Sequence, residues 1–140
     1  MTPKPFSMIS KHGWRDKMER TVLLYNFGGK RLQAVRKALS PLGCRVMPVP
    51  EKDFGMTIGS VLGIHDIISD NKPQETPTFK DEMLVMYGFQ GEMIDVLLAA
   101  LRMGGVGKIP LKAVVTQNNI NWSSTELYRE IKAEHEYMNR

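Results

Sequence analysis

The sequence contains a single cysteine, Cys44, so no disulfide can form within the chain. This excludes the small disulfide-rich scaffolds of secreted proteins and leaves packing as the source of stability, as is usual in a reducing compartment. Cys44 begins the apolar stretch CRVMPV. A small buried side chain is therefore favoured there over a reactive thiol.

Long hydrophobic runs are also absent. No stretch approaches the ~20 apolar residues of a transmembrane helix, and the N-terminus lacks the apolar run of a secretory signal peptide. We therefore expect a soluble, cytoplasmic protein without a membrane partner. At 140 residues with 42% hydrophobic content, the chain is large enough to bury one core.

The residue patterns that carry most enzyme chemistry are missing. The three histidines, His12, His65 and His135, lie far apart without metal-binding spacing, so we predict no metal and no cofactor. No nucleophile has an evident base and no carboxylate pair stands at a strand end, so we assign no catalytic residue. The stretch 104–108 (GGVGK) resembles a phosphate loop but follows a predicted helix, whereas a phosphate loop precedes one. The sequence therefore leans against an enzyme.

Positive charge is unevenly distributed along the chain, whose net charge is +4. Residues 21–50 contain five basic residues and no acidic one, residues 51–82 carry an acidic excess, and residues 83–140 hold six of each sign. A surface for a polyanion is therefore confined to the N-terminal arm and the first predicted helix. The candidate nucleic-acid contacts are Lys30, Arg31, Arg36 and Lys37.

Two similar halves follow a basic N-terminal arm. Residues 1–20 contain scattered apolar residues with no clear period, which is typical of a flexible arm. Residues 21–140 form one predicted α/β domain, in which the repeats 21–63 and 83–138 are joined by a polar linker, 64–82. Each repeat alternates apolar strands with amphipathic helices, in the order strand, helix, strand, helix.

The two halves align with each other. YNFGGKRLQAVRKALSPLG, which begins at Tyr25, matches YGFQGEMIDVLLAALRMGG, which begins at Tyr87, without gaps at an offset of 62. An insertion near Gly107 then places Thr57 on Ser123, two predicted helix N-caps. We interpret the similarity as an internal duplication, because chance resemblance of two amphipathic helices would explain the helix match alone.

The apolar residues of the strands predict the direction and order of the strands in the sheet. Strands that are apolar at nearly every position suit a parallel sheet with helices on both faces. Short right-handed crossovers then give four strands in the order 2-1-3-4, with the two repeats meeting at the centre. A ferredoxin-like α+β fold with an antiparallel sheet is the alternative. That alternative would place the two Tyr-x-Phe segments at opposite ends.

A parallel sheet would bring the carboxyl ends of the central strands together at a switch point, where such sheets bind ligands. The segments YNFGG and YGFQG would form this crevice, each leading into a helix N-terminus that favours an anion, with the polar loop 116–122 nearby. The structural alternative is that the aromatic residues pack while glycines and asparagines make turns. The candidate ligand-binding residues are Tyr25, Asn26, Gly28, Gly29, Tyr87, Gly88, Gln90, Asn118, Asn121 and Trp122.

Several segments of the sequence resemble a known family. VLLYNF, MLVMYGF, IPLKAVVT, NW and LYREIKAEHEYM are similar to an uncharacterised bacterial family, the domain of unknown function 3783. The resemblance covers residues 21–50 and 79–138. It implies a bacterial, cytoplasmic origin, and it carries over no catalytic residue because the family has no established activity.

The sequence leaves three classes of function open. The first is a noncatalytic binding or protein-interaction module, with self-association as its simplest version, because several of the ten methionines lie on predicted apolar faces. The second is a small-ligand or anion-binding protein, or a weak enzyme, that uses the switch-point crevice. Weak, nonspecific nucleic-acid binding is the third.

Overall fold

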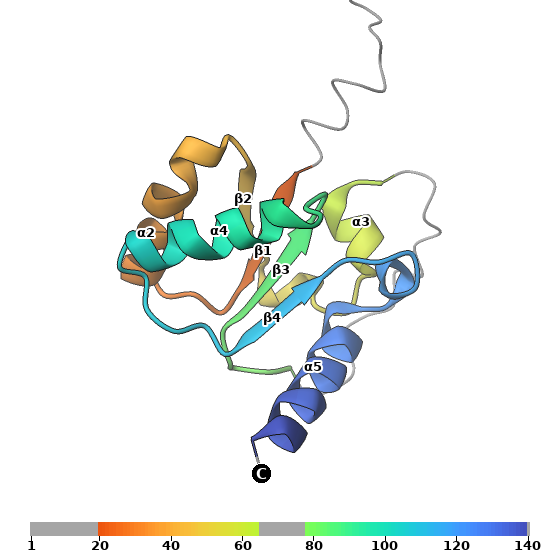
Figure 1. Ribbon diagram of the computed structural model, residues 1–140. Coiled ribbons are helices and arrows are strands. Elements are labelled where there is room, and N and C mark those ends of the chain that lie inside the picture. Colours follow the sequence, from red (N-terminus) through yellow and green to blue (C-terminus); the bar gives the residue numbers. More distant parts are fainter. Residues whose placement is uncertain (1–19, 65–77, 140) are drawn as a thin grey trace, which may run out of the picture.

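The computed structural model describes residues 20–64 and 78–139 (Figure 1). The predicted arm, apart from its last residue, and most of the predicted linker lie outside the described residues. The described chain forms the strands β1 Thr21–Tyr25, β2 Arg45–Pro48, β3 Met83–Tyr87 and β4 Leu111–Val114. Its α-helices are α2 Gly29–Leu39, α3 Ile58–Leu62, α4 Glu92–Met103 and α5 Ser124–Met138. The 3₁₀ helices are η1 Ser40–Leu42, η2 Glu51–Asp53 and η3 Asn119–Asn121.

Local sequence signals begin and end several of these helices. Thr57 caps α3 by accepting a hydrogen bond from the N–H of Ser60. Ser123 and Glu126 form a capping box at the start of α5. Gly63 ends α3 at φ +82°, a left-handed conformation that glycine adopts without strain. The predicted caps are therefore confirmed.

The sheet has the predicted order β2-β1-β3-β4, but its strands do not all run in one direction. β1 is parallel to β2 and β3 is parallel to β4, whereas the central strands β1 and β3 are antiparallel. The prediction of a purely parallel sheet is therefore wrong. The antiparallel ferredoxin-like alternative does not form either, because both outer pairs are parallel.

The segment directly before β3 sets where that strand starts. α3 ends near the amino end of the sheet, where the carbonyl of Leu62 lies 3.5 Å from Nη2 of Arg45, the first residue of β2. Residues 78–82 lie at the carboxyl end of β1, where the side chain of Asn26 donates to the carbonyls of Phe79 (2.9 Å) and Asp81 (3.0 Å). β3 therefore starts beside Tyr25 and runs against β1.

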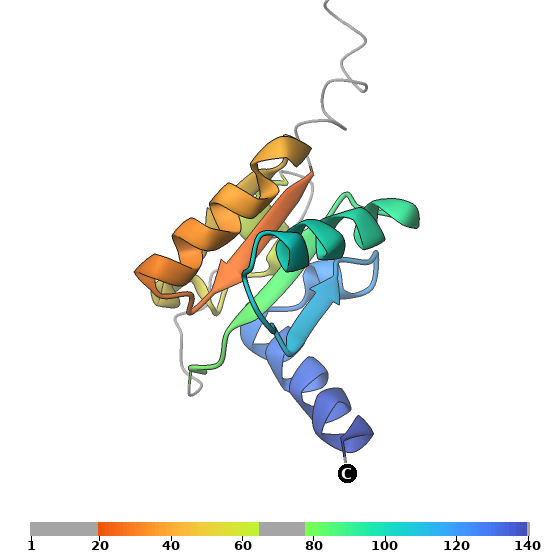
Figure 2. The ribbon, with the colours of Figure 1, turned by 60° about the vertical axis from the view of Figure 1, so that its left-hand side comes forward.

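Helices cover both faces of the sheet, as predicted (Figure 1, Figure 2). The core beneath α2 and α4 includes Val22, Leu24, Leu84 and Met86 from the strands and Val35, Leu39, Leu97 and Leu101 from the helices. The core on the other face includes Leu23, Tyr25, Met83, Val85, Ile58, Leu62 and Leu127. Because neighbouring residues of β1 and β3 face opposite cores, both strands are apolar at nearly every position.

Equivalent positions of the two halves meet at the centre of the molecule. Leu23 of β1 pairs with Val85 of β3, and Thr57 forms an isolated antiparallel bridge with Ser123. The sequence alignment equates Thr57 with Ser123, and Leu23 and Val85 stand at its offset of 62, two residues before its start. The two N-caps of α3 and α5 thus lie beside each other. The duplication itself stays a prediction from the sequence.

Candidate functional site

The predicted crevice between the two Tyr-x-Phe segments does not form. Because β1 and β3 are antiparallel, Tyr25 pairs with Met83 at one end of the sheet, and Tyr87 pairs with Thr21 at the other. The carboxyl ends of the central strands therefore point in opposite directions. One crevice cannot contain both segments.

At the carboxyl end of β1, the predicted site residues belong to the packed structure. The side chain of Tyr25 is buried, and its hydroxyl lies 2.8 Å from Oγ of Ser124. Burial raises the pKa of the Tyr25 hydroxyl. Asn26 adopts φ +66° and uses its amide to hold the segment before β3. Gly28 and Gly29 are exposed at the start of α2.

The carboxyl ends of β3 and β4, which are parallel and adjacent, carry a pocket of about 790 Å³. Four predicted residues line it: Tyr87, Gly88, Gln90 and Asn121. The other lining residues are Phe89, Val114, Val115, Thr116, Gln117 and Ile120. We call it the amide pocket, after the side chains of Gln90, Gln117 and Asn121. The structure thus brings together the second half of the predicted ligand site.

Two predicted residues of the loop after β4 are not part of this lining. Asn118 is exposed, and Trp122 is half-buried against the core beneath α3 and α5. The carbonyl of Trp122 accepts a hydrogen bond from the N–H of Ile58 (2.8 Å). Trp122 therefore helps to hold α3 against the start of α5.

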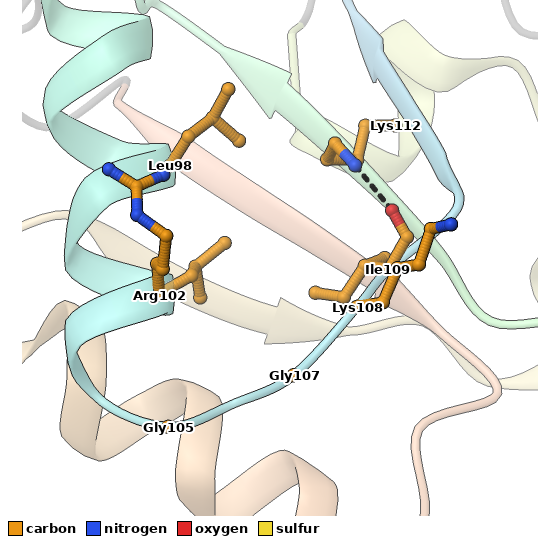
Figure 3. Close-up of a pocket in the computed structure, with 8 residues that line it drawn as sticks. Leu98, Arg102, Gly105, Gly107, Lys108, Ile109 and Lys112 are labelled. Atoms are coloured by element: carbon orange, nitrogen blue, oxygen red, sulfur yellow. Dashed lines mark hydrogen bonds between the residues drawn. The ribbon is translucent and has the colours of Figure 1, made fainter.

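A second pocket, of about 520 Å³, lies between α4 and the start of β4 (Figure 3). Its lining residues are Leu98, Leu101, Arg102, Gly105, Gly107, Lys108, Ile109 and Lys112. Figure 3 shows Arg102 on α4 and the two lysines on the opposite side. We call it the basic pocket, because its charged lining residues are all cations.

The three cations of the basic pocket are not neutralised. Arg102, Lys108 and Lys112 form no ion pair within the part of the chain that the structure describes. The ammonium group of Lys112 donates to the carbonyl of Ile109. Burial lowers the pKa of Lys112, and the charge of Lys108 lowers it further. The pocket therefore has a positive potential that an anion would relieve.

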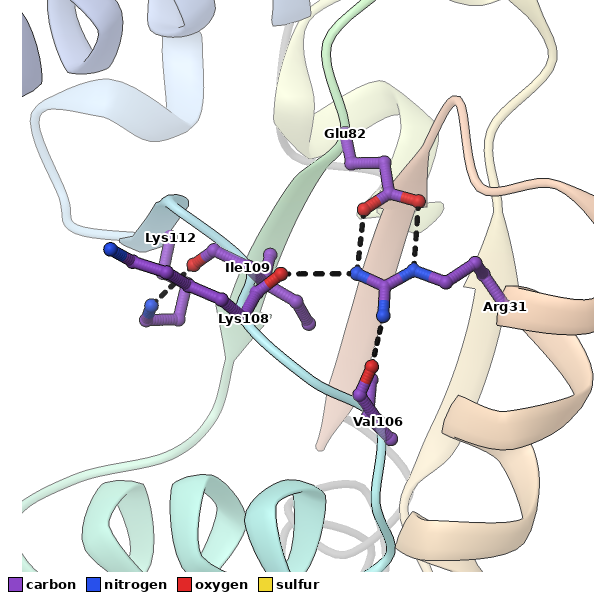
Figure 4. A network of polar contacts seen from close by, with 6 residues as sticks. All are labelled: Arg31, Glu82, Val106, Lys108, Ile109 and Lys112. Atoms are coloured by element: carbon purple, nitrogen blue, oxygen red, sulfur yellow. Dashed lines mark hydrogen bonds and ion pairs between the residues drawn. The ribbon is translucent and has the colours of Figure 1, made fainter.

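Arg31 of α2 fixes the loop that carries Lys108 (Figure 4). Its Nε and Nη2 donate to the two carboxylate oxygens of Glu82, at 3.1 and 2.7 Å. Its Nη1 donates to the carbonyl of Val106, and Nη2 also donates to the carbonyl of Lys108 (3.2 Å). The guanidinium also lies 5.6 Å from the ring centroid of Phe27. Arg31 thus has a structural role in the loop of the basic pocket.

The other predicted nucleic-acid residues remain on the exposed side of α2. Lys30, Arg36 and Lys37 are exposed, and Arg36 Nη1 lies 3.4 Å from the carbonyl of Val46. None of them lines the basic or the amide pocket. Because Arg31 is engaged with Glu82, the surface has three exposed cations where the sequence indicated four.

The sequence interpretation missed the basic pocket, although a signal was present. No acidic residue lies between Asp95 and Glu126, while Arg102, Lys108 and Lys112 all fall in that stretch. Averaging the charge over residues 83–140 concealed the local excess. A shorter window would have identified these cations as a group.

A polar cluster between α5 and the segment before β3 was also not predicted. The hydroxyl of Tyr128 donates to Oδ2 of Asp81 (2.7 Å), and the ammonium of Lys132 lies 2.9 Å from the same oxygen. The hydrogen bonds from Tyr128 and Lys132 lower the pKa of Asp81. The ring of Tyr128 stacks on Phe79, with centroids 4.1 Å apart. These contacts hold α5 against the segment before β3.

Within residues 20–64 and 78–139, no cluster of side chains is suited to hold a metal ion. No helix in the same part of the chain is long and apolar enough to cross a membrane.

Comparison with known proteins gives a match to a family model in the second half of the chain. Residues 82–138 match the family model described as Domain of unknown function (DUF3783), so the resemblance found in the sequence is confirmed for this segment. The matched segment contains every lining residue of both pockets and also Glu82, but not Arg31. Neither the curated proteins nor the solved structures gave a match. The function is therefore argued from the geometry of the pockets.

Proposed function

We propose that this protein is a noncatalytic binding module for an anionic ligand, which it holds in the basic pocket. One observation carries the proposal: Arg102, Lys108 and Lys112 line a single pocket that no acidic residue lines. Partial burial lowers the pKa of Lys112, and repulsion by the charge of Lys108 lowers it further. A bound anion would supply the missing counter-charge.

The ligand also has an apolar part in this proposal. Leu98, Leu101 and Ile109 line the pocket beside the cations. Ligand pockets commonly combine such apolar surface with a few charged groups that fix orientation. An amphiphilic anion, such as an alkyl phosphate, fits this lining better than an inorganic ion.

The lining also supports binding over catalysis. It contains no serine, threonine, cysteine, histidine or carboxylate that would serve as nucleophile or general base. Lysine and arginine stabilise negative charge. The amines of Lys108 and Lys112 would form a covalent bond only with a carbonyl group, which an alkyl phosphate lacks. The expectation that the protein is not an enzyme stays a prediction.

Calorimetric titration with hexyl phosphate, inorganic phosphate and hexanol tests the proposal. We expect hexyl phosphate to bind about 10-fold more tightly than inorganic phosphate, from the apolar surface that its chain buries. Binding should weaken as salt rises. Hexanol should show no measurable binding. Equal affinity for hexanol and hexyl phosphate would refute an anion site.

Two lysine variants provide matched controls for this titration. Lys112→Gln removes one pocket cation and should weaken hexyl phosphate binding by about 10-fold, as expected for a lost charge-assisted contact. Lys37→Gln removes the same charge from exposed α2 and should change affinity little. Lys112→Gln should alter the free energy of unfolding by less than about 0.5 kcal/mol, because its charge is not favoured by folding. Similar binding losses in the two variants would contradict the assignment.

The sequence also indicated a protein partner or self-association, and this stays a prediction. The exposed apolar side chains that a partner would cover are Met103 (85% exposed), Met138 (77%), Tyr137 (66%) and Val96 (43%). Bacterial origin, cytoplasmic location and nucleic-acid binding likewise stay predictions.

A further inference from the structure

The amide pocket differs from the basic pocket in its chemistry. Its lining contains no charged residue. The turn after β3 is shaped by Gly88 at φ +86°, where a Cβ would lie 3.2 Å from Cα of Arg20. The positive φ favours glycine at this position, which lines the pocket.

Three side-chain amides of the lining have unused hydrogen-bonding capacity. Gln90, Gln117 and Asn121 are exposed, and their amides form no hydrogen bond within the described part of the chain. Each primary amide has two donors and one acceptor oxygen. Gln90 follows β3 whereas Gln117 and Asn121 follow β4, so the three lining residues come from the ends of two neighbouring strands.

The neighbouring residue Asn119 shows how the loop after β4 keeps its shape. Its Oδ1 accepts from the N–H of Thr116 (2.8 Å), and its Nδ2 donates to the carbonyl of Val114 (3.1 Å). The N–H of Asn119 also donates to the hydroxyl of Thr116. Asn119 is buried and makes the turn, so the shape of the loop does not depend on Gln117 or Asn121.

Apolar surface completes the lining. Val114, Val115 and Ile120 come from β4 and the loop after it, and Tyr87 comes from the end of β3. Such side chains pack against the faces of a flat ring, while the amides bind its edge.

We propose that the amide pocket binds an uncharged, planar nitrogen heterocycle with adjacent hydrogen-bond donors and acceptors, the chemistry of a cyclic amide or a nucleobase. A primary amide matches such an edge with two parallel hydrogen bonds, as asparagine and glutamine do with adenine. A charged ligand would be desolvated without a counter-charge in this lining. The site shares no residue with the basic pocket, so the two proposals stand or fall separately.

NMR titration of the ¹⁵N-labelled chain with uridine, adenosine and ribose tests this site. We expect the side-chain amide signals of Gln90, Gln117 and Asn121 to shift with either nucleoside, with a dissociation constant of about 1 mM for so small a ligand. Ribose should cause no such shift. No shift at ~10 mM nucleoside, or an equal response to ribose, overturns the proposal.

Matched variants separate specific contacts from general effects. Gln117→Leu and Asn121→Leu should each weaken nucleoside binding by about 10-fold. Asn118→Leu changes an exposed amide of the same loop outside the lining, and it should leave affinity unchanged. Backbone spectra of the variants show whether each is folded, and the wild-type titration tests the site without any variant. Equal losses in all three variants count against the site.

A further titration identifies the source of the heterocycle. If the base is carried on a strand, a uridine tetranucleotide should bind at least ~10-fold more tightly than uridine while it shifts the same side-chain amides. If a free heterocycle is the ligand, the tetranucleotide should gain nothing over uridine. Both results support the site, whereas tetranucleotide binding that leaves these amide signals unmoved contradicts it.

Discussion

Arg31 and Glu82 form a two-point ion pair, with Nη2 of the arginine 2.7 Å from Oε1 of the glutamate. The pair joins α2 in the first half of the chain to the residue that precedes β3 in the second half. The same guanidinium donates to two carbonyls of the loop that carries Lys108. The shape of the basic pocket therefore depends on a residue outside the segment that matches the family model.

Arg31→Gln should lower both stability and anion binding. The change leaves Glu82 and the carbonyls of Val106 and Lys108 without their donor, which costs about 1–2 kcal/mol for a partly exposed network. Urea unfolding measures the stability, and hexyl phosphate titration measures the site. Arg36→Gln is the control, because that exposed arginine makes a single 3.4 Å contact with a carbonyl. Equal effects of the two substitutions would show that Arg31 does not anchor the loop.

Gly104→Ala should destabilise the packing of α4 against α2. A Cβ at Gly104 would lie 2.6 Å from Cβ of Ala38, too close for two carbon atoms. Such overpacking costs about 1–3 kcal/mol. Adding Ala38→Gly should recover part of the loss, although glycine within a helix itself costs about 1 kcal/mol. Thermal unfolding of both variants measures this.

Gly29→Ala is the control for that experiment. A Cβ at Gly29 meets no atom within 4 Å at the start of α2, so this substitution should not destabilise the protein. If Ala38→Gly fails to recover any stability in the Gly104→Ala background, the steric explanation is wrong.

The stability that Asp81 contributes should disappear in acid. Tyr128 and Lys132 hold the pKa of this carboxyl below its ordinary value of 3.8. A carboxyl with a lowered pKa in the folded state stabilises the protein above its unfolded pKa, and the contribution is lost as pH falls through the folded pKa. Asp81→Asn should therefore be less stable than wild type at pH 7. The difference should shrink below about pH 4.

Urea midpoints at a series of pH values from about 7 to 2.5 measure that difference across the carboxyl range. Glu134→Gln changes an exposed carboxylate on α5, and its difference from wild type should stay small throughout. A stability difference for Asp81→Asn that does not change with pH would mean that the ionised carboxylate is not what holds Tyr128 and Lys132.

Local sequence signals predicted most of the fold. Apolar runs located the strands, amphipathic periodicity located α2, α4 and α5, and capping residues located the ends of helices such as α3. The strand order followed from short crossovers within each half, because a strand, helix and strand joined by tight turns place parallel strands side by side. Of the candidate ligand-binding residues that the sequence indicated, Tyr87 ends β3, Gln90 follows it and Asn121 follows β4, and all three line the amide pocket.

The direction of β3 was decided by tertiary structure alone. A strand that is apolar at every position indicates burial on both faces of the sheet. Because such burial is the same next to a parallel or an antiparallel neighbour, the pattern does not give the direction of the strand. Asn26 binds the carbonyls of Phe79 and Asp81, and this contact between distant parts of the chain brings β3 in beside Tyr25. Because β3 runs antiparallel to β1, the two Tyr-x-Phe segments lie at opposite ends of the sheet.

The basic pocket likewise depended on contacts between distant residues. The sequence by itself determined that Arg102, Lys108 and Lys112 occur without a nearby acid. That they line one pocket follows from the turn after α4 and from Arg31, a residue of α2 that binds that turn. Secondary-structure propensity depends on a few neighbouring residues. The basic pocket is instead formed by packing between elements that are distant in the sequence, and no local pattern predicts that packing.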